Sequence, residues 1–316
     1  MSFLVELPVA AYRADVFDHF TPDADFHIGT ARALMWMSQL AYEVRDAPDK
    51  VEPILRQWDF DLIDLLAHVN PGLVPIASTR GLVAHGRGAF VIAFAGTDPL
   101  ALGNWITNFM LGSRAREAHF GFEAAVHAVW GDLAAALKKR TTQPLFITGH
   151  SLGGALAVIA AERIARELKI MPAGVYTYGA PRVGAAAFRS AYAAAGLAER
   201  TFRLVHGHDV IPTIPPSRLG FRHVGRMLAC PRAGRFAPDG LSAGDCDDPP
   251  FVDTLRSGYR QRWQDIRTRS FPPSSRKGVL GWYQRYVLPP LIGDHLPDRY
   301  RGALDEVPRA QTTSRT

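Results

Sequence analysis

Residues 145–157 read LFITGHSLGGALA and decide the fold. The apolar run Leu145–Thr148 predicts a short buried strand, and Gly153–Leu168 after the turn has the composition of a helix. A serine at the tip of a sharp strand-to-helix turn has crowded neighbours, and the small residues at 149, 153 and 154 relieve that crowding. The helix also directs its N-terminal amides at the site, where an oxyanion would be stabilised. The stretch therefore predicts that Ser151 is a nucleophile.

Strand-like and helix-like segments alternate on both sides of this turn. The predicted strands are Gly81–His85, Ala89–Ala95, Leu145–Thr148, Val175–Tyr178 and Thr201–His206, the first two joined as a hairpin. The predicted helices are Ile28–Val44, Val51–Leu66, Phe122–Leu137, Gly153–Leu168, Ala186–Ala195 and Asp253–Ile266. Strands separated by helices of this length form a parallel sheet covered on both faces. The fold class is thus α/β, with a mostly parallel central sheet.

The composition is that of a globular protein, with 47% hydrophobic and 21% charged residues among 316. Disordered and fibrous classes are excluded on that basis. The alternation stops after Pro212, and Pro-Pro pairs mark the chain that follows. We expect one domain over residues 1–305 with a Pro-rich C-terminal third, 217–292, and a polar tail, 306–316.

Three blocks resemble a known family. GHSLGGALA, with AFAGTD upstream and YTYGAPRVG downstream, is similar to the class 3 lipases, the fungal-lipase-like branch of the α/β-hydrolase fold. The resemblance runs from about Trp36 to Pro216 and resumes near Asp294. It implies an ester hydrolase that acts on acylglycerols or similar lipids, with a Ser-Asp-His triad and no cofactor.

A serine nucleophile needs a base, and the base needs an orienting carboxylate. Asp209 follows the strand Thr201–His206, at the edge of a parallel sheet where active-site residues gather. It also stands in a block similar to the family's D-V-x-P. The competing acids, which have no strand before them, are Asp245, Asp247 and Asp248.

Two histidines follow Asp209 and could act as the base. His295 lies in GDHLPDRY, which resembles the family's DH…Y block, and a late loop can reach over the sheet edge. His223 has the setting of a structural histidine in a strand, and we favour His295. The pair His206 and His208 has the spacing of metal ligands on a strand, but further ligands are missing, so we expect no metal site.

An oxyanion hole needs two donors. The amide of Leu152 follows the nucleophile and supplies one. The resemblance assigns the other to Thr97, although the family commonly has Arg where this chain has Ala95. In the family, the region after Asp98 carries a lid. Leu100, Leu102 and Trp105 are our candidates for a lid or acyl pocket, with simple core packing as the alternative.

The basic excess is concentrated near the C terminus. Between Phe251 and Arg301 there are ten Lys or Arg and four Asp, and Asp253–Ile266 places Leu255, Tyr259, Trp263 and Ile266 on one face. Packing against the sheet explains such a face, and contact with an anionic lipid surface is the alternative. No nucleic-acid module accompanies the charge, so we expect no such partner.

Two further expectations complete the prediction. Cys230 and Cys246 have no metal-ligand spacing, and one bridge between them is possible. We find no signal peptide or spanning segment and therefore expect a cytoplasmic location, with peripheral membrane association as an option.

Rival functions are a phospholipase A1 or lysophospholipase on anionic membranes, and a non-catalytic lipid-binding protein on the same scaffold.

Overall fold

The computed structural model describes residues 5–69, 78–97, 115–244, 246, 249–267 and 293–305. Its α-helices are α1 (Ile28–Leu40), α2 (Glu43–Asp46), α3 (Val51–Gln57), α5 (Ala115–Ala128), α6 (Trp130–Leu137), α7 (Leu152–Arg163), α8 (Ala186–Ala194), α9 (Phe251–Arg267) and α12 (Pro297–Leu304). Its strands are β1 (Phe60–Val69), β2 (Ser78–Gly86), β3 (Ala89–Phe94), β4 (Leu145–His150), β5 (Gly174–Tyr178), β6 (Gly184–Ala185), β7 (Thr201–His206), β8 (Phe221–Arg222) and β9 (Arg226–Cys230). Short helical turns are η1 (Val9–Ala11), η2 (Ala14–Phe17), η3 (Pro48–Lys50), η4 (Ile164–Leu168), η5 (Ala198–Arg200), η6 (Ile211–Thr213), η7 (Ser217–Leu219) and η8 (Pro238–Gly240).

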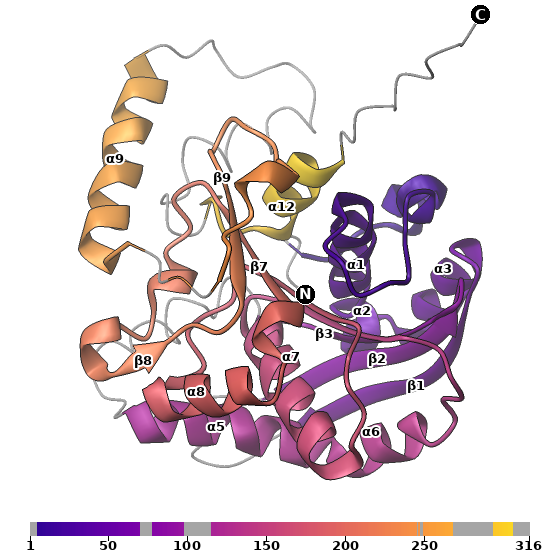
Figure 1. Ribbon diagram of the computed structural model, residues 1–316. Helices are drawn as coiled ribbons and strands as arrows, with labels where there is room; N and C mark the ends of the chain where they lie inside the picture. Colours follow the sequence, from indigo (N-terminus) through magenta and orange to yellow (C-terminus); the bar gives the residue numbers. More distant parts are fainter. Residues whose placement is uncertain are drawn as a thin grey trace, which may run out of the picture.

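The main sheet that these residues form has the order β1-β2-β3-β4-β5-β7-β9 (Figure 1). β3, β4, β5, β7 and β9 run parallel, whereas β1 and β2 pair antiparallel at one edge. Parallel neighbours need crossover connections, and α5 with α6, α7 and α8 supply them between β3 and β4, β4 and β5, and β5 and β7. The connection from β7 to β9 contains only η6, η7 and the short strand β8. The predicted α/β class with a mostly parallel sheet is confirmed.

Apolar side chains on both sides of the central strands give the sheet two buried faces. Val91 and Ala93 of β3 face one hydrophobic cluster, while Phe90, Ile92 and Phe94 face the other. Successive side chains of a strand point to opposite faces, so each strand contributes to both cores.

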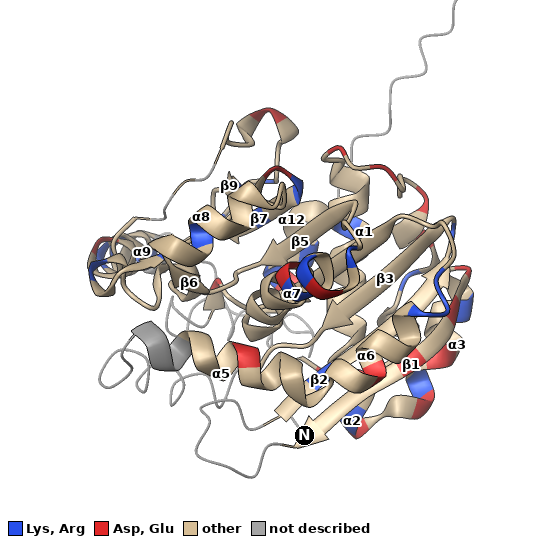
Figure 2. Ribbon diagram, turned by 60° about the horizontal axis from the view of Figure 1, so that its bottom comes forward, with Lys and Arg blue, Asp and Glu red and all other residues tan. Residues whose placement is uncertain are grey.

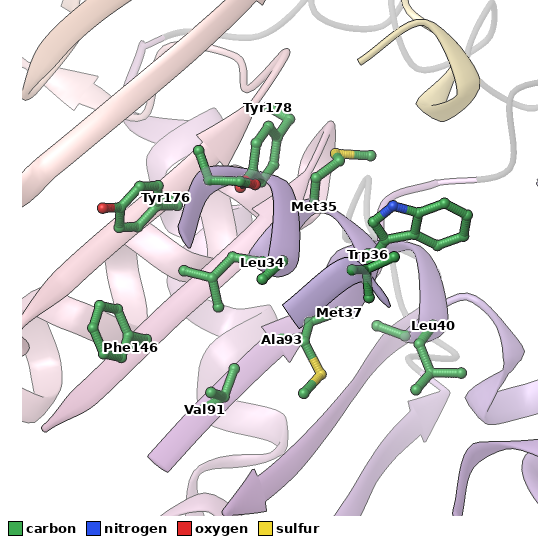
Figure 3. Packing of buried hydrophobic residues seen from close by; sticks show 14 of the residues in the cluster. Leu34, Met35, Trp36, Met37, Leu40, Val91, Ala93, Phe146, Tyr176 and Tyr178 are labelled. Carbon is green, nitrogen blue, oxygen red and sulfur yellow. Dashed lines mark hydrogen bonds between the residues drawn. The ribbon is translucent and has the colours of Figure 1, made fainter. Parts of the chain in front are cut away.

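Helix α1 covers the first face of the sheet. Figure 3 shows Leu34 and Met37 of α1 packing over Val91, Phe146 and Tyr176 of the central strands. Nearly the whole of α1 is buried, which agrees with its lack of a polar face. Helices α5, α6 and α7 cover the second face, where α7 contacts β4 and β5.

Two parts of the predicted element pattern were wrong. The expected helix Val51–Leu66 ends at Gln57, and Phe60–Val69 is instead the edge strand β1, paired with β2. The sheet also continues into the C-terminal third, because β9 adds a parallel strand beside β7. Cys230 and Cys246, for which a bridge was possible, are both free thiols.

Candidate active site

Ser151 occupies the turn between β4 and α7 in a strained conformation. Its φ of 60° and ψ of −130° lie in a region that residues with a side chain rarely adopt. The turn is fixed on both sides, since the Ser151 amide donates to the Tyr178 carbonyl at 2.8 Å and the Gly154 amide to the Ser151 carbonyl at 3.0 Å. The strain presents the serine side chain at the carboxyl end of the sheet.

The glycines around Ser151 allow this turn because there is no room for side chains. A Cβ at Gly149 would lie 2.1 Å from the carbonyl oxygen of Gly153, and a Cβ at Gly153 would lie 2.3 Å from that of Phe94. Real Cβ atoms do not approach backbone so closely, so the requirement for small residues inferred from the sequence is steric.

The structure brings Ser151, His295 and Asp209 together. His295 Nε2 lies 2.8 Å from Ser151 Oγ, and His295 Nδ1 lies 2.7 Å from Asp209 Oδ2. All three residues are buried. The carboxylate accepts a hydrogen bond from Nδ1–H, which leaves Nε2 free to accept a hydrogen bond from the Ser151 hydroxyl. Side chains separated by 144 and 86 positions thus form one proton-transfer chain.

Asp209 is held by two further donors. The Ile211 amide donates to Oδ1 at 2.8 Å, and the Tyr300 hydroxyl donates to Oδ2 at 2.6 Å. Gly179, with φ of +58°, leaves the space that these groups occupy, since a Cβ there would lie 2.5 Å from Asp209 Oδ2. The carboxylate is therefore kept in one orientation toward His295.

The loop that carries His295 is anchored by its preceding residue, Asp294. Arg232 donates from Nε to Asp294 Oδ1 at 2.9 Å, and the His208 amide donates to Oδ2 at 3.0 Å. Burial works to raise the pKa of Asp294, but the interactions with the imidazole and amide of His208 and the Arg232 charge outweigh it and lower that pKa. The ionised Asp294 thereby fixes the base loop to the segment that bears Asp209.

The other candidate residues have different positions. His223 lies beyond β8 and donates from Nε2 to the Pro212 carbonyl at 2.7 Å, so it has the structural setting that the sequence suggested. Asp245, Asp247 and Asp248 lie outside the described residues. Leu100, Leu102 and Trp105, the candidates for a lid or acyl pocket, also lie outside them.

Both predicted oxyanion donors belong to segments beside Ser151. Leu152 is the first residue of α7. Thr97 follows Gly96, and a Cβ at Gly96 would lie 2.8 Å from Ser151 Cβ, so the 96–97 peptide is next to the nucleophile. The positive end of the α7 dipole adds to the attraction for negative charge at this point.

Sequence reasoning missed Tyr300 and Tyr42 as parts of the site. Tyr300 belongs to the DH…Y block, whose tyrosine was noted without a role. Tyr42 donates its hydroxyl to His150 Nδ1 at 2.8 Å, and nothing near it in the sequence indicates this partner. Only the fold places α1 and its following turn beside the nucleophile segment.

A serine on a strand-to-helix turn, an acid after a later strand and a histidine on a late loop define an α/β-hydrolase with a Ser-His-Asp arrangement. The sequence model described as Lipase (class 3) matches residues 91–219, a segment that includes Ser151 and Asp209. Over this segment the chain is similar to the class 3 lipases.

Curated relatives match this chain over part of their length. A secreted mono- and diacylglycerol lipase 1 of Fusarium solani is 38% identical over 130 residues, 38% of this chain and 38% of the relative. A lipase of Rhizomucor miehei is 28% identical over 199 residues, 57% of this chain and 54% of the relative. This chain thus spans about half or less of the length of these two relatives.

Solved structures of lipases share the fold. A lipase from Rhizopus microsporus var. chinensis superimposes with a TM-score of 0.54 at 18% identity, covering 80% of this chain and 94% of that one. The propeptide complex of a Rhizomucor miehei lipase deletion mutant gives a TM-score of 0.55 at 22% identity, covering 72% and 77%.

The predicted cytoplasmic location is wrong by the same comparison. The Fusarium solani relative and a similar lipase of Penicillium cyclopium are both named as secreted. The prediction relied on the lack of a leader-like segment, and the same core and triad chemistry suit either compartment. Among the described helices, none combines the length and apolar character that a bilayer crossing requires.

Proposed function

We propose that the protein is a carboxylic ester hydrolase that cleaves lipid esters of the acylglycerol type through an acyl-enzyme. The observation that carries this proposal is the pair of short contacts from His295, 2.8 Å to Ser151 Oγ and 2.7 Å to Asp209 Oδ2. The names of the secreted mono- and diacylglycerol lipase and of the Rhizomucor miehei lipase support the choice of substrate class.

In the first half of the reaction, Ser151 Oγ attacks the ester carbonyl while His295 Nε2 takes its proton. The carbonyl oxygen becomes negative and is stabilised by the amides of Thr97 and Leu152. The carbon–oxygen bond to the alcohol then breaks, and His295 returns the proton to the leaving alcohol. In the second half, His295 takes a proton from water, whose oxygen attacks the acyl-enzyme. The bond between the acyl carbon and Ser151 Oγ then breaks, His295 returns the proton to Oγ, and the fatty acid is released.

A lipid substrate is presented at a surface, and α9 offers a face suited to one. Thr254, Gly258 and Arg262 form the buried stripe of this helix. The exposed side carries Val252, Tyr259 and Trp263, with exposed fractions of 49%, 44% and 65%.

Of the face predicted from the sequence, Tyr259 and Trp263 are exposed and Leu255 is partly buried, while the side chain of Ile266 lies outside the described part of the helix. The exposure of both aromatic side chains favours contact with a lipid surface over packing against the sheet. Arg256, Arg260 and Arg267 are exposed beside these aromatic side chains, and Figure 2 shows basic residues on α9 at one end of the molecule. Aromatic side chains flanked by arginines suit the boundary of an anionic membrane. This face favours, as a second candidate, hydrolysis of phospholipid esters by the same triad.

The test is hydrolysis of p-nitrophenyl esters from C2 to C16 and of lipid vesicles by the wild type and Ser151→Ala. Turnover by the wild type with a loss of about 10⁶ in kcat for the variant supports the proposal. Faster cleavage of anionic phospholipid vesicles than of neutral acylglycerol, declining with salt, would select the second candidate. A wild type that is inert on every ester would overturn both and favour a lipid-binding scaffold.

A further inference from the structure

The carbonyl of Gly96 accepts a hydrogen bond from a buried arginine on the neighbouring strand. Arg80 of β2 donates from Nη2 to Gly96 O at 3.0 Å. Arg80 stands directly across the sheet from Ala95, whose amide donates to the Arg80 carbonyl at 2.9 Å. The guanidinium thus reaches along the β2–β3 pair to the loop that ends beside Ser151.

The hydrogen bond from Arg80 is made to the Gly96–Thr97 peptide, whose N–H is the proposed donor to the oxyanion. The Gly96 carbonyl and the Thr97 amide are the two ends of one planar peptide group, and in a trans peptide they point in opposite directions. A donor that holds the carbonyl therefore also fixes where the Thr97 N–H points. Gly96 is also closely surrounded, since a Cβ there would lie 2.4 Å from the Tyr42 hydroxyl and 2.7 Å from the His150 carbonyl oxygen.

The guanidinium is itself held in place. Arg80 is buried, its Cζ lies 5.8 Å from the centre of the Tyr42 ring, and Nη1 lies 4.0 Å from Asp46 Oδ2. A hydrogen bond from a charged donor also polarises the peptide that accepts it, which makes the N–H at the far end a better donor.

We propose that Arg80 is a positioning residue for the oxyanion hole, acting through the Gly96–Thr97 peptide. The class 3 lipases that this chain resembles commonly have an arginine at the position of Ala95, whereas here an arginine reaches the same loop from the facing strand. Arg80 would act through this peptide rather than on the reacting atoms themselves. The inference rests on the proposed function, because it assigns the Thr97 amide to the developing oxyanion.

The experiment compares Arg80→Met and Arg80→Lys with the wild type on a p-nitrophenyl ester, measuring kcat and KM separately. We expect kcat to fall about 10- to 100-fold in Arg80→Met, below the limit of 10²–10³ for losing one oxyanion donor, with KM nearly unchanged. Arg80→Lys keeps a charged donor and should retain more activity. A boronic acid that forms a tetrahedral adduct with Ser151 should bind more weakly in parallel with the fall in kcat.

Arg87→Met is the matched control. Arg87 also donates to backbone carbonyls, those of Trp58 and Phe17, but at the opposite end of the same hairpin. It should lose thermal stability without loss of kcat. If Arg80→Met folds poorly, Arg80→Lys carries the comparison.

Wild-type kcat and boronate affinity in both Arg80 variants would overturn the inference, as would an equal loss of kcat in Arg87→Met. Activity of the wild type, absent in Ser151→Ala, shows separately that the proposed function stands.

Discussion

The imidazole of His150 lies against that of His295, with ring centres 4.7 Å apart, and binds the backbone of the same residue. His150 Nε2 is 2.8 Å from the His295 carbonyl, which can only accept, so Nε2 carries a proton. Nδ1 then accepts from the Tyr42 hydroxyl. Burial above all, and then the neighbouring His295, hold the pKa of His150 well below its ordinary value. A neutral His150 thus positions the base by its main chain, without competing for protons.

Acid should destabilise the fold from about pH 6.5 downward, through His150 and His206. Burial lowers the pKa of both side chains in the folded state. Below pH 6.5 the unfolded chain therefore binds protons at these histidines that the folded chain does not bind. Their contribution is complete above the unfolded pKa and is lost as the pH falls below it, by up to ~1.4 kcal/mol per pH unit for each group. Urea unfolding of the wild type and His206→Phe between pH 7.5 and 4.5 measures this, and the variant should show the shallower slope. Equal slopes would remove His206 from the explanation.

Gly179→Ala should abolish most activity, whereas Gly196→Ala should not. Both glycines have positive φ, +58° and +74°, so both variants should lose about 1 kcal/mol of stability. Only at Gly179 would the new Cβ meet Asp209, at 2.5 Å, and Gly196 has open space around it. We expect at least about a 100-fold lower kcat/KM for Gly179→Ala. Similar activity of the two variants in an ester assay would contradict this reading of the acid's packing.

Tyr300→Phe should lower kcat/KM about 10- to 100-fold, because the hydroxyl donates to the Asp209 carboxyl at 2.6 Å. The ring packs on Phe236 and is kept by the substitution. Tyr192→Phe is the control, since its buried hydroxyl pairs with Thr201 at 2.9 Å, away from the triad. Tyr192→Phe should lower the free energy of unfolding but leave ester turnover intact. An equal loss of kcat/KM in both variants would contradict a specific role for the Tyr300 hydroxyl.

Ser151→Gly should be more stable than Ser151→Ala by about 1 kcal/mol. Both variants lack the hydroxyl and its contact with His295, but only glycine adopts φ of 60° without a steric cost. Urea midpoints at fixed pH give the difference. Identical midpoints would show that the turn stores no strain at this residue.

Replacing both Arg256 and Arg260 of α9 by Ser should weaken binding to anionic vesicles about 30-fold, at ~1 kcal/mol for each arginine near the surface. Trp263→Ser should weaken binding to neutral and anionic vesicles alike. Met171→Ser is the control. It removes another exposed apolar side chain, which lies just before the start of β5 and outside α9. Sedimentation with vesicles at low and high salt measures each, and unchanged binding in the α9 variants would exclude this face.

The sequence allowed a correct prediction where the local backbone conformation requires particular residue types. The turn around Ser151 needs small residues on both sides, and those residues are visible in the chain. The strand β1 was missed because Leu62, Leu65 and Leu66 also suit one helix face, and only pairing with β2 selects the strand. β9 is a five-residue segment that begins with an arginine and has no long apolar run, so only its pairing with β7 selects the strand. The division into one domain and a polar tail stays a prediction.

Asp294 gives the base loop an anchor of its own, next to the residue that it must position. The length of the 86-position connection between Asp209 and His295 therefore does not by itself determine where the base lies in the triad. Doubling the length of a flexible connection costs only ~0.6 kcal/mol in closure entropy. Insertions and deletions in the loops of that stretch that spare Ile211, β9 and Arg232 can therefore change what surrounds the substrate while the proton-transfer chain keeps its geometry.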